Sequence, residues 1–169
     1  MIEACSLPTN ALLHRYANRG YYTDCYTTHT PGSVSHVAFV ATFYTTWLFQ
    51  LERLILRWAV SRPSTDAEAR QLAMGERDSF AAWSVEARSE NQLLLRDLYG
   101  RTRSWLMTEP DEGGTRLYFG SAVLPVSRST ATQPAMGLRV KALLGFHRIY
   151  SRLLLRTASR CLMAGKHKM

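Results

Sequence analysis

Four arginines near the end of the chain follow one another at intervals of four residues: Arg148, Arg152, Arg156 and Arg160. A step of four residues turns an α-helix by about 400°, so each arginine is displaced by about 40° from the one before. The four therefore form a slanted row on one side of a helix. Such a row can contact an anion, and we take these residues as anion-contact candidates. A solvated helix face has the same spacing, so the alternative stays open.

The same segment carries a polar pair, because His147 and Tyr150 lie three residues apart on a predicted helix. Apolar residues, among them Phe146 and Leu154, share their side of that helix. The pair could point into a pocket, where it would bind a ligand or transfer a proton. A histidine that is packed and hydrogen-bonded in the core is the alternative interpretation.

A second pair of basic residues lies on a predicted strand. Arg101 and Arg103 have the same strand parity as Trp105, so all three side chains are expected on one face. If that face is concave, two guanidinium groups could clamp a carboxylate or a phosphate. If it is the outer face, both arginines are solvated.

Aromatic side chains are the third group of candidates, because apolar pockets with a few polar groups bind small molecules. Packing in an ordinary core is the alternative role for all of them. The candidates are Tyr44 and Trp47 on a predicted helix, and Trp83, Trp105, Tyr118 and Phe119 on predicted strands.

No catalytic, metal or cofactor signature is visible. Asp24, His29 and His36 have separations that match no usual ligand pattern, so no metal site is predicted. Neither a nucleophile elbow nor a glycine-rich phosphate or dinucleotide motif is present. We therefore expect no cofactor and assign no catalytic residue, and an enzymatic function has the least support.

The chain of 169 residues has a formal net charge of +8, and the charge is unevenly distributed. Residues 139–169 hold eight basic residues and no acid, whereas the first 138 hold 13 basic and 13 acidic residues. This asymmetry indicates an anionic partner such as a phospholipid surface. Nucleic acid is not favoured, because no binding motif accompanies the charge.

Cysteine usage and the first residues indicate a location. Cys5, Cys25 and Cys161 are far apart in sequence and form no C-x-x-C pair, which fits a reducing compartment. No basic region followed by an apolar run opens the chain. We expect a cytoplasmic protein, with peripheral contact to a membrane as an open alternative. The uncharged stretch 33–51 is too polar to favour a membrane span over a buried helix.

The first half of the chain predicts one strand and two helices. Residues 1–20 have no clean period and are expected to be a loosely attached, flexible arm. Residues 21–29 predict a strand, and 34–60 a long apolar helix that we expect to bend. Thr65 and Glu68 form a capping box, and Gly75 is expected to end a short helix.

The second half predicts a meander and a terminal helix. Four strands are expected within 79–126, and the polar segment 127–137 is expected to be a loop. A helix follows over about 138–164. The prediction is a single α+β domain over 21–164, with a basic tail at 165–169. An antiparallel sheet of about five strands would pack against the long N-terminal and C-terminal helices.

This order resembles the helix-grip arrangement of the START-like superfamily, in which a curved antiparallel sheet wraps a long C-terminal helix. The stretches "FYTTWLFQLERLILRW", "GRTRSWLM" and "LLGFHRIYSRLLL" are also similar to a family of uncharacterised bacterial proteins. The START-like resemblance implies a pocket for a lipid-like molecule between sheet and helix. A non-catalytic binding module is thus the first hypothesis, and a peripheral protein whose basic helix contacts an anionic membrane or partner is the second. An enzyme acting in the same cavity is the third.

Overall fold

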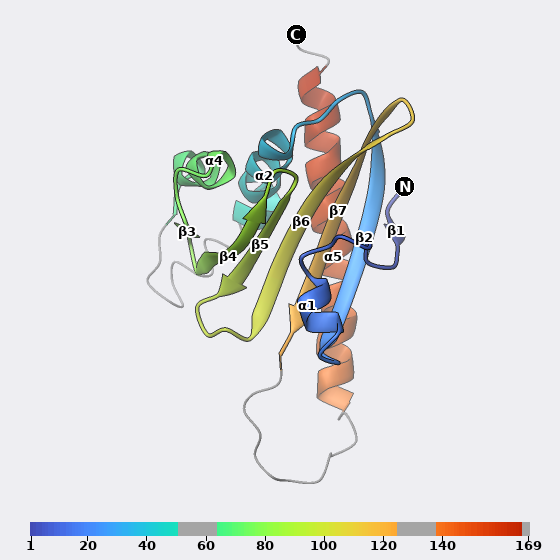
Figure 1. The fold of residues 1–169 in the computed structure, drawn as a ribbon, viewed down its shortest axis with the longest axis vertical. Coiled ribbons are helices and arrows are strands. Elements are labelled where there is room, and N and C mark those ends of the chain that lie inside the picture. Colours follow the sequence, from blue (N-terminus) through green and yellow to red (C-terminus); the bar gives the residue numbers. More distant parts are fainter. Residues whose placement is uncertain (51–63, 125–137, 167–169) are drawn as a thin grey trace.

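A computed structural model describes residues 1–50, 64–124 and 138–166, with the backbone alone for 138–146 and 166. One open antiparallel sheet carries helices on one face and an N-terminal segment on the other (Figure 1). The order of the strands is β1-β2-β7-β6-β5-β4-β3. They span Glu3–Ala4 (β1), Tyr22–Pro31 (β2), Ser79–Phe80 (β3), Trp83–Ser89 (β4), Gln92–Asp97 (β5), Thr102–Asp111 (β6) and Gly114–Val123 (β7). The helices are α1 (His14–Ala17), α2 (His36–Thr45), α4 (Asp66–Met74) and α5 (Leu138–Lys166).

The α+β class and the antiparallel meander are confirmed, but the predicted count of about five strands is wrong, because the described sheet has seven. The two additional strands, β1 and β3, have two residues each. A strand of that length is too short to show an alternating pattern. The predicted loop 127–137 and residues 167–169 of the predicted basic tail lie outside the described residues.

The long helix predicted over 34–60 is interrupted at Thr46, whose ψ of 148° is not helical. The hydroxyl of Thr46 donates to the carbonyl of Phe43 at 2.9 Å and accepts from the amide of Phe49 at 3.3 Å. One side chain thus caps the end of α2 and the start of the next helical residues. The remainder of the predicted helix, from 51 to 60, lies outside the described residues.

The capping signals of α4 are confirmed. Thr65 accepts from the amide of Glu68 at 3.2 Å, and the Glu68 carboxylate accepts from the amide of Thr65 at 2.9 Å. Gly75 ends the helix with φ of 81°, in the left-handed region that glycine adopts without strain.

The main core lies between the sheet and the helices. Phe43, Tyr44 and Phe49 meet Phe119 of β7 and Phe80 of β3 in a continuous aromatic cluster. All five side chains are at most 5% exposed. This cluster fills the region of the sheet that α2 and α4 cover (Figure 1).

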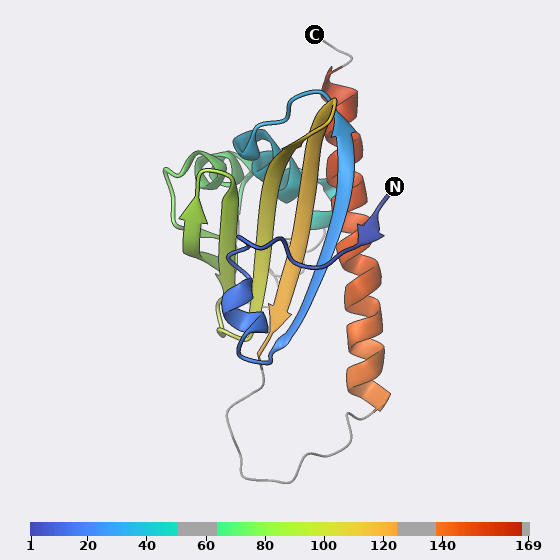
Figure 2. The same cartoon turned by 45° about the vertical axis from the view of Figure 1, so that its right-hand side comes forward.

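A second core lies on the opposite face, where the first 21 residues cross the sheet (Figure 2). Leu13 is fully buried against this face, and Tyr16 is 4% exposed. Gly120 of β7 makes this possible, because a Cβ there would lie 3.1 Å from Leu13 and 2.7 Å from the carbonyl of Asp24. The segment thus differs from the loosely attached arm expected over 1–20.

No helix of the described part of the chain is long and apolar enough to cross a membrane.

Candidate functional site

The last helix, α5, places its aliphatic side against the sheet and α2. Leu154, Leu155 and Ala158 are at most 3% exposed. Because the arginines recur every four residues, they follow the opposite side and all lie exposed: Arg148, Arg152, Arg156 and Arg160. Figure 2 shows this helix running alongside β2, the long strand next to the sheet edge.

Two of the four arginines contact tyrosines of β2. The Arg148 Nε donates to the Tyr22 hydroxyl at 3.2 Å. The guanidinium of Arg152 lies over the Tyr26 ring, 5.4 Å from its centroid. Burial, with a further contribution from the Asp24 carboxylate, raises the pKa of Tyr26 to about 12, so its hydroxyl stays protonated at neutral pH. These contacts hold the row beside β2 without neutralising its charge.

A groove of about 800 Å³ opens along the rest of the row, between α5 and the β1–β2 edge. We call it the α5 groove. Its basic side chains are Arg152, Arg156, Arg160 and His29, and its apolar ones are Met1, Ile2, Ile149, Leu153 and Met163; Thr28 and Ser159 complete the lining.

The α5 groove carries uncompensated positive charge. Within the described part of the chain, no Asp or Glu lines it, and none forms an ion pair with an arginine of the row. Guanidinium groups in such a setting bind carboxylates or phosphates through charge-assisted hydrogen bonds. The apolar residues beside them can cover a hydrocarbon chain.

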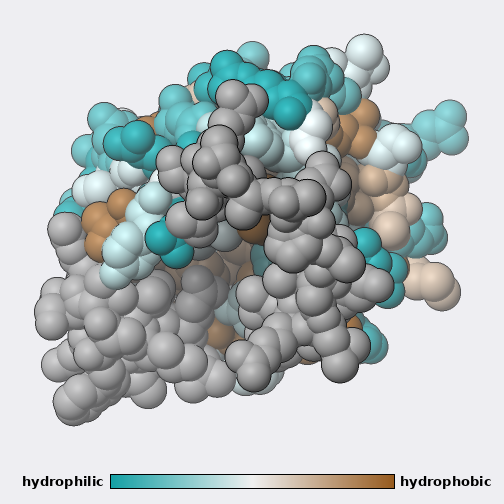
Figure 3. Space-filling model, turned by 90° about the horizontal axis from the view of Figure 1, so that it is seen from below, coloured by the Kyte–Doolittle hydropathy of each residue, from teal (hydrophilic) through white to brown (hydrophobic). Residues whose placement is uncertain are grey.

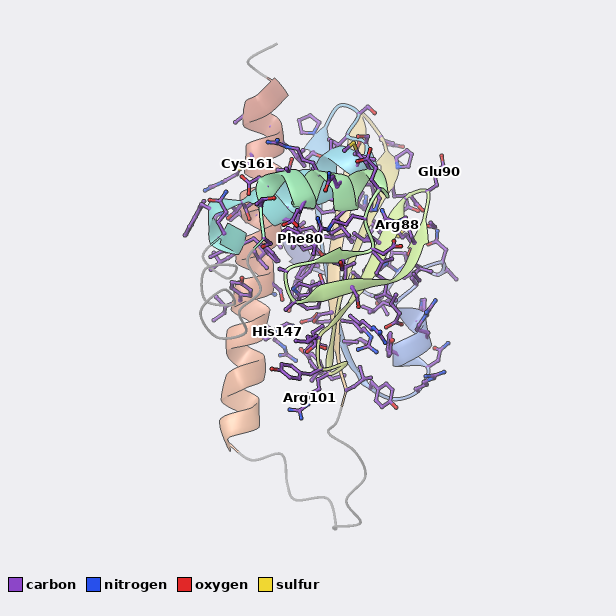
Figure 4. All side chains as sticks on the ribbon, turned by 90° about the vertical axis from the view of Figure 1, so that its left-hand side faces the viewer. Phe80, Arg88, Glu90, Arg101, His147 and Cys161 are labelled. Atoms are coloured by element: carbon purple, nitrogen blue, oxygen red, sulfur yellow. The ribbon has the colours of Figure 1, made fainter. Side chains whose placement is uncertain are left out.

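A second polar arrangement lies nearer the other end of α5, where His147 faces the sheet (Figure 4). The Ser121 Oγ lies 2.6 Å from the His147 Nε2 and 2.6 Å from the Asp24 Oδ1. Asp24 also accepts from the amide of Ser121 at 3.0 Å. The structure thus joins β2, β7 and α5 through one serine hydroxyl.

The direction of these hydrogen bonds opposes nucleophilic catalysis. An ionised carboxylate only accepts, so the single proton of Ser121 is donated to Asp24. The His147 Nε2 must then carry a proton and donate it to the Ser121 oxygen. In a catalytic triad the imidazole instead accepts the serine proton, and the acid orients its other nitrogen. The cluster therefore fixes α5 on the sheet.

His147 and Tyr150, which were predicted as a pair, contact different parts of the structure. His147 bonds to Ser121, whereas Tyr150 is half-buried against the main core. Sequence reasoning did not identify Asp24 and Ser121 as partners of His147. A signal was present, since Asp24 shares strand parity with Tyr26, whose side chain belongs to the main core.

Arg101 and Arg103 do not form a clamp. Arg101 is exposed in the turn before β6, whereas Arg103 is 8% exposed on the face that carries α1. The Arg103 Nε lies 2.6 Å from the Glu86 Oε2, and it donates to the Tyr16 hydroxyl at 2.7 Å. Its charge is therefore already paired inside the second core.

The predicted aromatic candidates do not line a common cavity. Trp83 and Phe119 pack in the main core, whereas Trp105 and Tyr118 lie in the second core on the other face of the sheet. Tyr118 and Phe119 are adjacent on β7, so their side chains point to opposite faces of the sheet.

The two aromatic candidates on the predicted helix, Tyr44 and Trp47, also lie in different environments. Tyr44 is buried, and its hydroxyl lies 3.1 Å from the Ser104 Oγ. Trp47 follows the interruption at Thr46 and is 66% exposed. Of the predicted candidates, three arginines of the row share one groove: Arg152, Arg156 and Arg160.

The structure does not bring Asp24, His29 and His36 together. Across the described residues, no three His, Cys, Asp or Glu side chains are grouped closely enough to hold a metal ion. His36 lies near Arg88, which reaches from β4 to the end of α4 and donates to the Leu72 carbonyl at 2.9 Å (Figure 4).

Comparisons with known proteins add little to this geometry. No protein-family model and no curated protein matches the chain. The chain is similar to a solved structure of protein Ms6760 from Mycobacterium smegmatis, with 11% sequence identity and a TM-score of 0.40. That similarity covers 95% of this chain and 97% of the other.

Proposed function

We propose that the chain is a non-catalytic binding module that holds a single amphipathic anion, a lipid-like molecule, in the α5 groove. The observation that carries this proposal is the composition of the lining. Three arginines and a histidine stand beside five apolar side chains, and no carboxylate is among the lining residues.

The dimensions of the α5 groove fit such a ligand. Pockets for small molecules commonly enclose about 300–1,000 Å³, and the volume of about 800 Å³ falls in that range. The head group would meet Arg156 and Arg160, which have no ion-pair partner among the described residues. The hydrocarbon chain would cover Leu153 and Met163, and each buried methylene would contribute about 0.8 kcal/mol.

The proposal places the ligand beside the sheet edge, not beneath the sheet. The region under α2 and α4 is filled by the aromatic cluster around Phe43. We infer further that α5 and the sheet form a helix-grip arrangement of the START-like kind. Packing of α5 against β2, β7 and α2 supports that inference.

A second candidate function is peripheral contact with an anionic membrane surface. One specific observation favours it: Ile149 is 62% exposed and Leu153 is 45% exposed, between arginines of the row. Basic helices with exposed aliphatic residues lie in the interface of anionic bilayers. The end of the molecule viewed in Figure 3 is mixed in polarity, with teal side chains interspersed with small brown patches.

Titration of a fluorescent long-chain fatty acid tests the first function. Arg156→Gln with Arg160→Gln should weaken binding by about 1 kcal/mol for each charge removed, which is about fivefold in Kd per charge. The loss should shrink as salt rises. Arg70→Gln, on the exposed side of α4, is the matched control and should leave Kd unchanged.

The same variants, measured on vesicles, separate the two functions. Retention of the protein on phosphatidylserine vesicles but not on phosphatidylcholine vesicles, without affinity for the monomeric fatty acid, would favour the membrane surface. Equal affinities of the wild type and the double arginine variant for both probes would refute both functions.

A further inference from the structure

Two cysteines that are 20 residues apart in the chain lie opposite each other across β1 and β2. The ladder pairs Glu3 with Thr27 and Ala4 with Tyr26, and its next step brings Cys5 to Cys25. The amide of Cys5 donates to the carbonyl of Cys25 at 3.0 Å. Their sulfur atoms are 3.1 Å apart, and both are free thiols.

A disulfide needs little further movement at this position. Opposed residues of an antiparallel pair have Cα atoms about 4.5–5.5 Å apart, and disulfides span about 4.4–6.8 Å. The sulfurs would approach by about 1 Å to reach the bond length of about 2.05 Å. The backbone pairing of β1 with β2 can therefore stay in place.

The two thiols differ in reactivity. The pKa of Cys5 is lowered, chiefly by its hydrogen bond with the Cys25 thiol and further by the positive charge of Arg116, although partial burial opposes both. The pKa of Cys25 is raised by the neighbouring Cys5 sulfur, by burial and by the Asp24 carboxylate. Cys5 is half-buried, whereas Cys25 is 5% exposed. Cys5 is therefore the attacking sulfur.

We propose that Cys5 and Cys25 are an oxidation site, at which a low-molecular-weight disulfide of the glutathione type converts the thiol pair into an intramolecular disulfide. The Cys5 thiolate attacks the small disulfide, forming a mixed disulfide and releasing one small thiolate. Cys25 gives its proton to solvent and attacks the Cys5 sulfur, which releases the second small thiolate. Two protein thiols are oxidised and one small disulfide is reduced to two thiols.

The bond would fasten the N-terminal segment to the sheet. It closes the loop that contains α1, and this loop carries Leu13 and Tyr16 of the second core. Arg15 and Arg19 are exposed within the loop and offer sites for trypsin. Oxidation should slow cleavage at both sites, because opening the loop far enough to enter a protease becomes harder.

The experiment incubates the full chain with oxidised glutathione, blocks free thiols with iodoacetamide and maps peptides without reduction. We expect the unalkylated chain to lose the mass of two hydrogen atoms. The tryptic peptide that ends at Arg15 should stay linked to the one that begins at Gly20, and only Cys161 should be alkylated. Cys161→Ser is the matched control, because Cys161 is exposed on α5, and it should oxidise like the wild type.

Cys5→Ser removes the attacking sulfur and should abolish the loss of two hydrogens. Alkylation of both Cys5 and Cys25 after incubation with oxidised glutathione would overturn the proposal. A bond that involves Cys161, or a glutathione adduct that persists on Cys5, would overturn it equally. Mapping of the wild type decides the question without dependence on whether a variant folds.

Discussion

Ser121 and His147 join the last strand to the last helix through one short contact, in which the Oγ lies 2.6 Å from the Nε2. The serine hydroxyl also donates to Asp24, whose side chain is 9% exposed. Removing the serine therefore deprives both His147 and Asp24 of a short hydrogen bond. Removing the histidine takes one hydrogen bond from Ser121, and from Asp24 only the longer contact between its Oδ2 and the His147 Nε2, at 3.7 Å.

We expect Ser121→Ala to lower the free energy of unfolding by about 1–3 kcal/mol, because buried polar partners are left unsatisfied. His147→Ala should cost about 1 kcal/mol, and the double variant little more than Ser121→Ala alone. Urea denaturation of the four proteins measures the coupling. Additive losses would contradict the contact between Ser121 and His147.

Local signals predicted α4 from the sequence in full. The capping box of Thr65 and Glu68 and the final Gly75 act within a few residues, so their effect depends on no distant partner. The interruption at Thr46 was not predicted at that residue, since an apolar period continues through it. The Thr46 hydroxyl bonds to the Phe43 carbonyl and to the Phe49 amide. This arrangement is favoured only when Phe49 packs into the core, and that packing depends on distant residues.

The candidate site was also predicted only in part, because some of its features are local in sequence and others depend on distant residues. The spacing of the arginines is local to α5, and it is sufficient to predict a row. The α5 groove also needs Ile2 and His29, which the sheet brings beside a helix more than 100 residues later in the chain. The pairing of Cys5 with Cys25 depends on the β1–β2 register, and β1 is too short to be recognised by its period.

Glu86 is expected to be essential for the second core, because it neutralises Arg103. Glu86→Gln leaves that guanidinium largely buried beside Tyr16, and we expect a loss of about 3 kcal/mol in the free energy of unfolding. The control is Arg116→Gln, which removes an exposed partner of Asp111 and should change stability little. Equal effects of the two substitutions in thermal or urea denaturation would contradict the burial of the Arg103 pair.

Leu13 tests whether the N-terminal segment is part of the fold. It is fully buried beside Gly120 and Trp105, so Leu13→Ala should leave a cavity and cost about 2–5 kcal/mol. Leu98→Ala removes the same atoms at a position that is 48% exposed and should cost far less. A segment that detaches freely from the sheet would tolerate both substitutions alike in denaturant titrations.

His36 is expected to make the protein sensitive to acid. Burial, with a smaller contribution from the Arg88 charge, lowers the pKa of His36 from 6.5 to about 4. Both ring nitrogens are buried and lack a hydrogen-bond partner in the described structure. The folded state therefore favours the neutral ring.

The sign of the resulting pH dependence follows from proton binding. Between pH 6.5 and about 4 the unfolded chain binds the His36 proton and the folded chain does not, so stability falls as the pH falls. The contribution is complete above pH 6.5, and about 3 kcal/mol is lost on reaching pH 4. His36→Leu removes this dependence and should change the free energy of unfolding little at pH 7, because an apolar group replaces an unpaired polar one.

Urea denaturation of both proteins at a series of pH values measures the contribution of His36. The carboxylates titrate in both proteins, so their effect cancels in the comparison. Parallel stability curves for the wild type and His36→Leu between pH 7 and 4 would show that His36 is not buried in its neutral form.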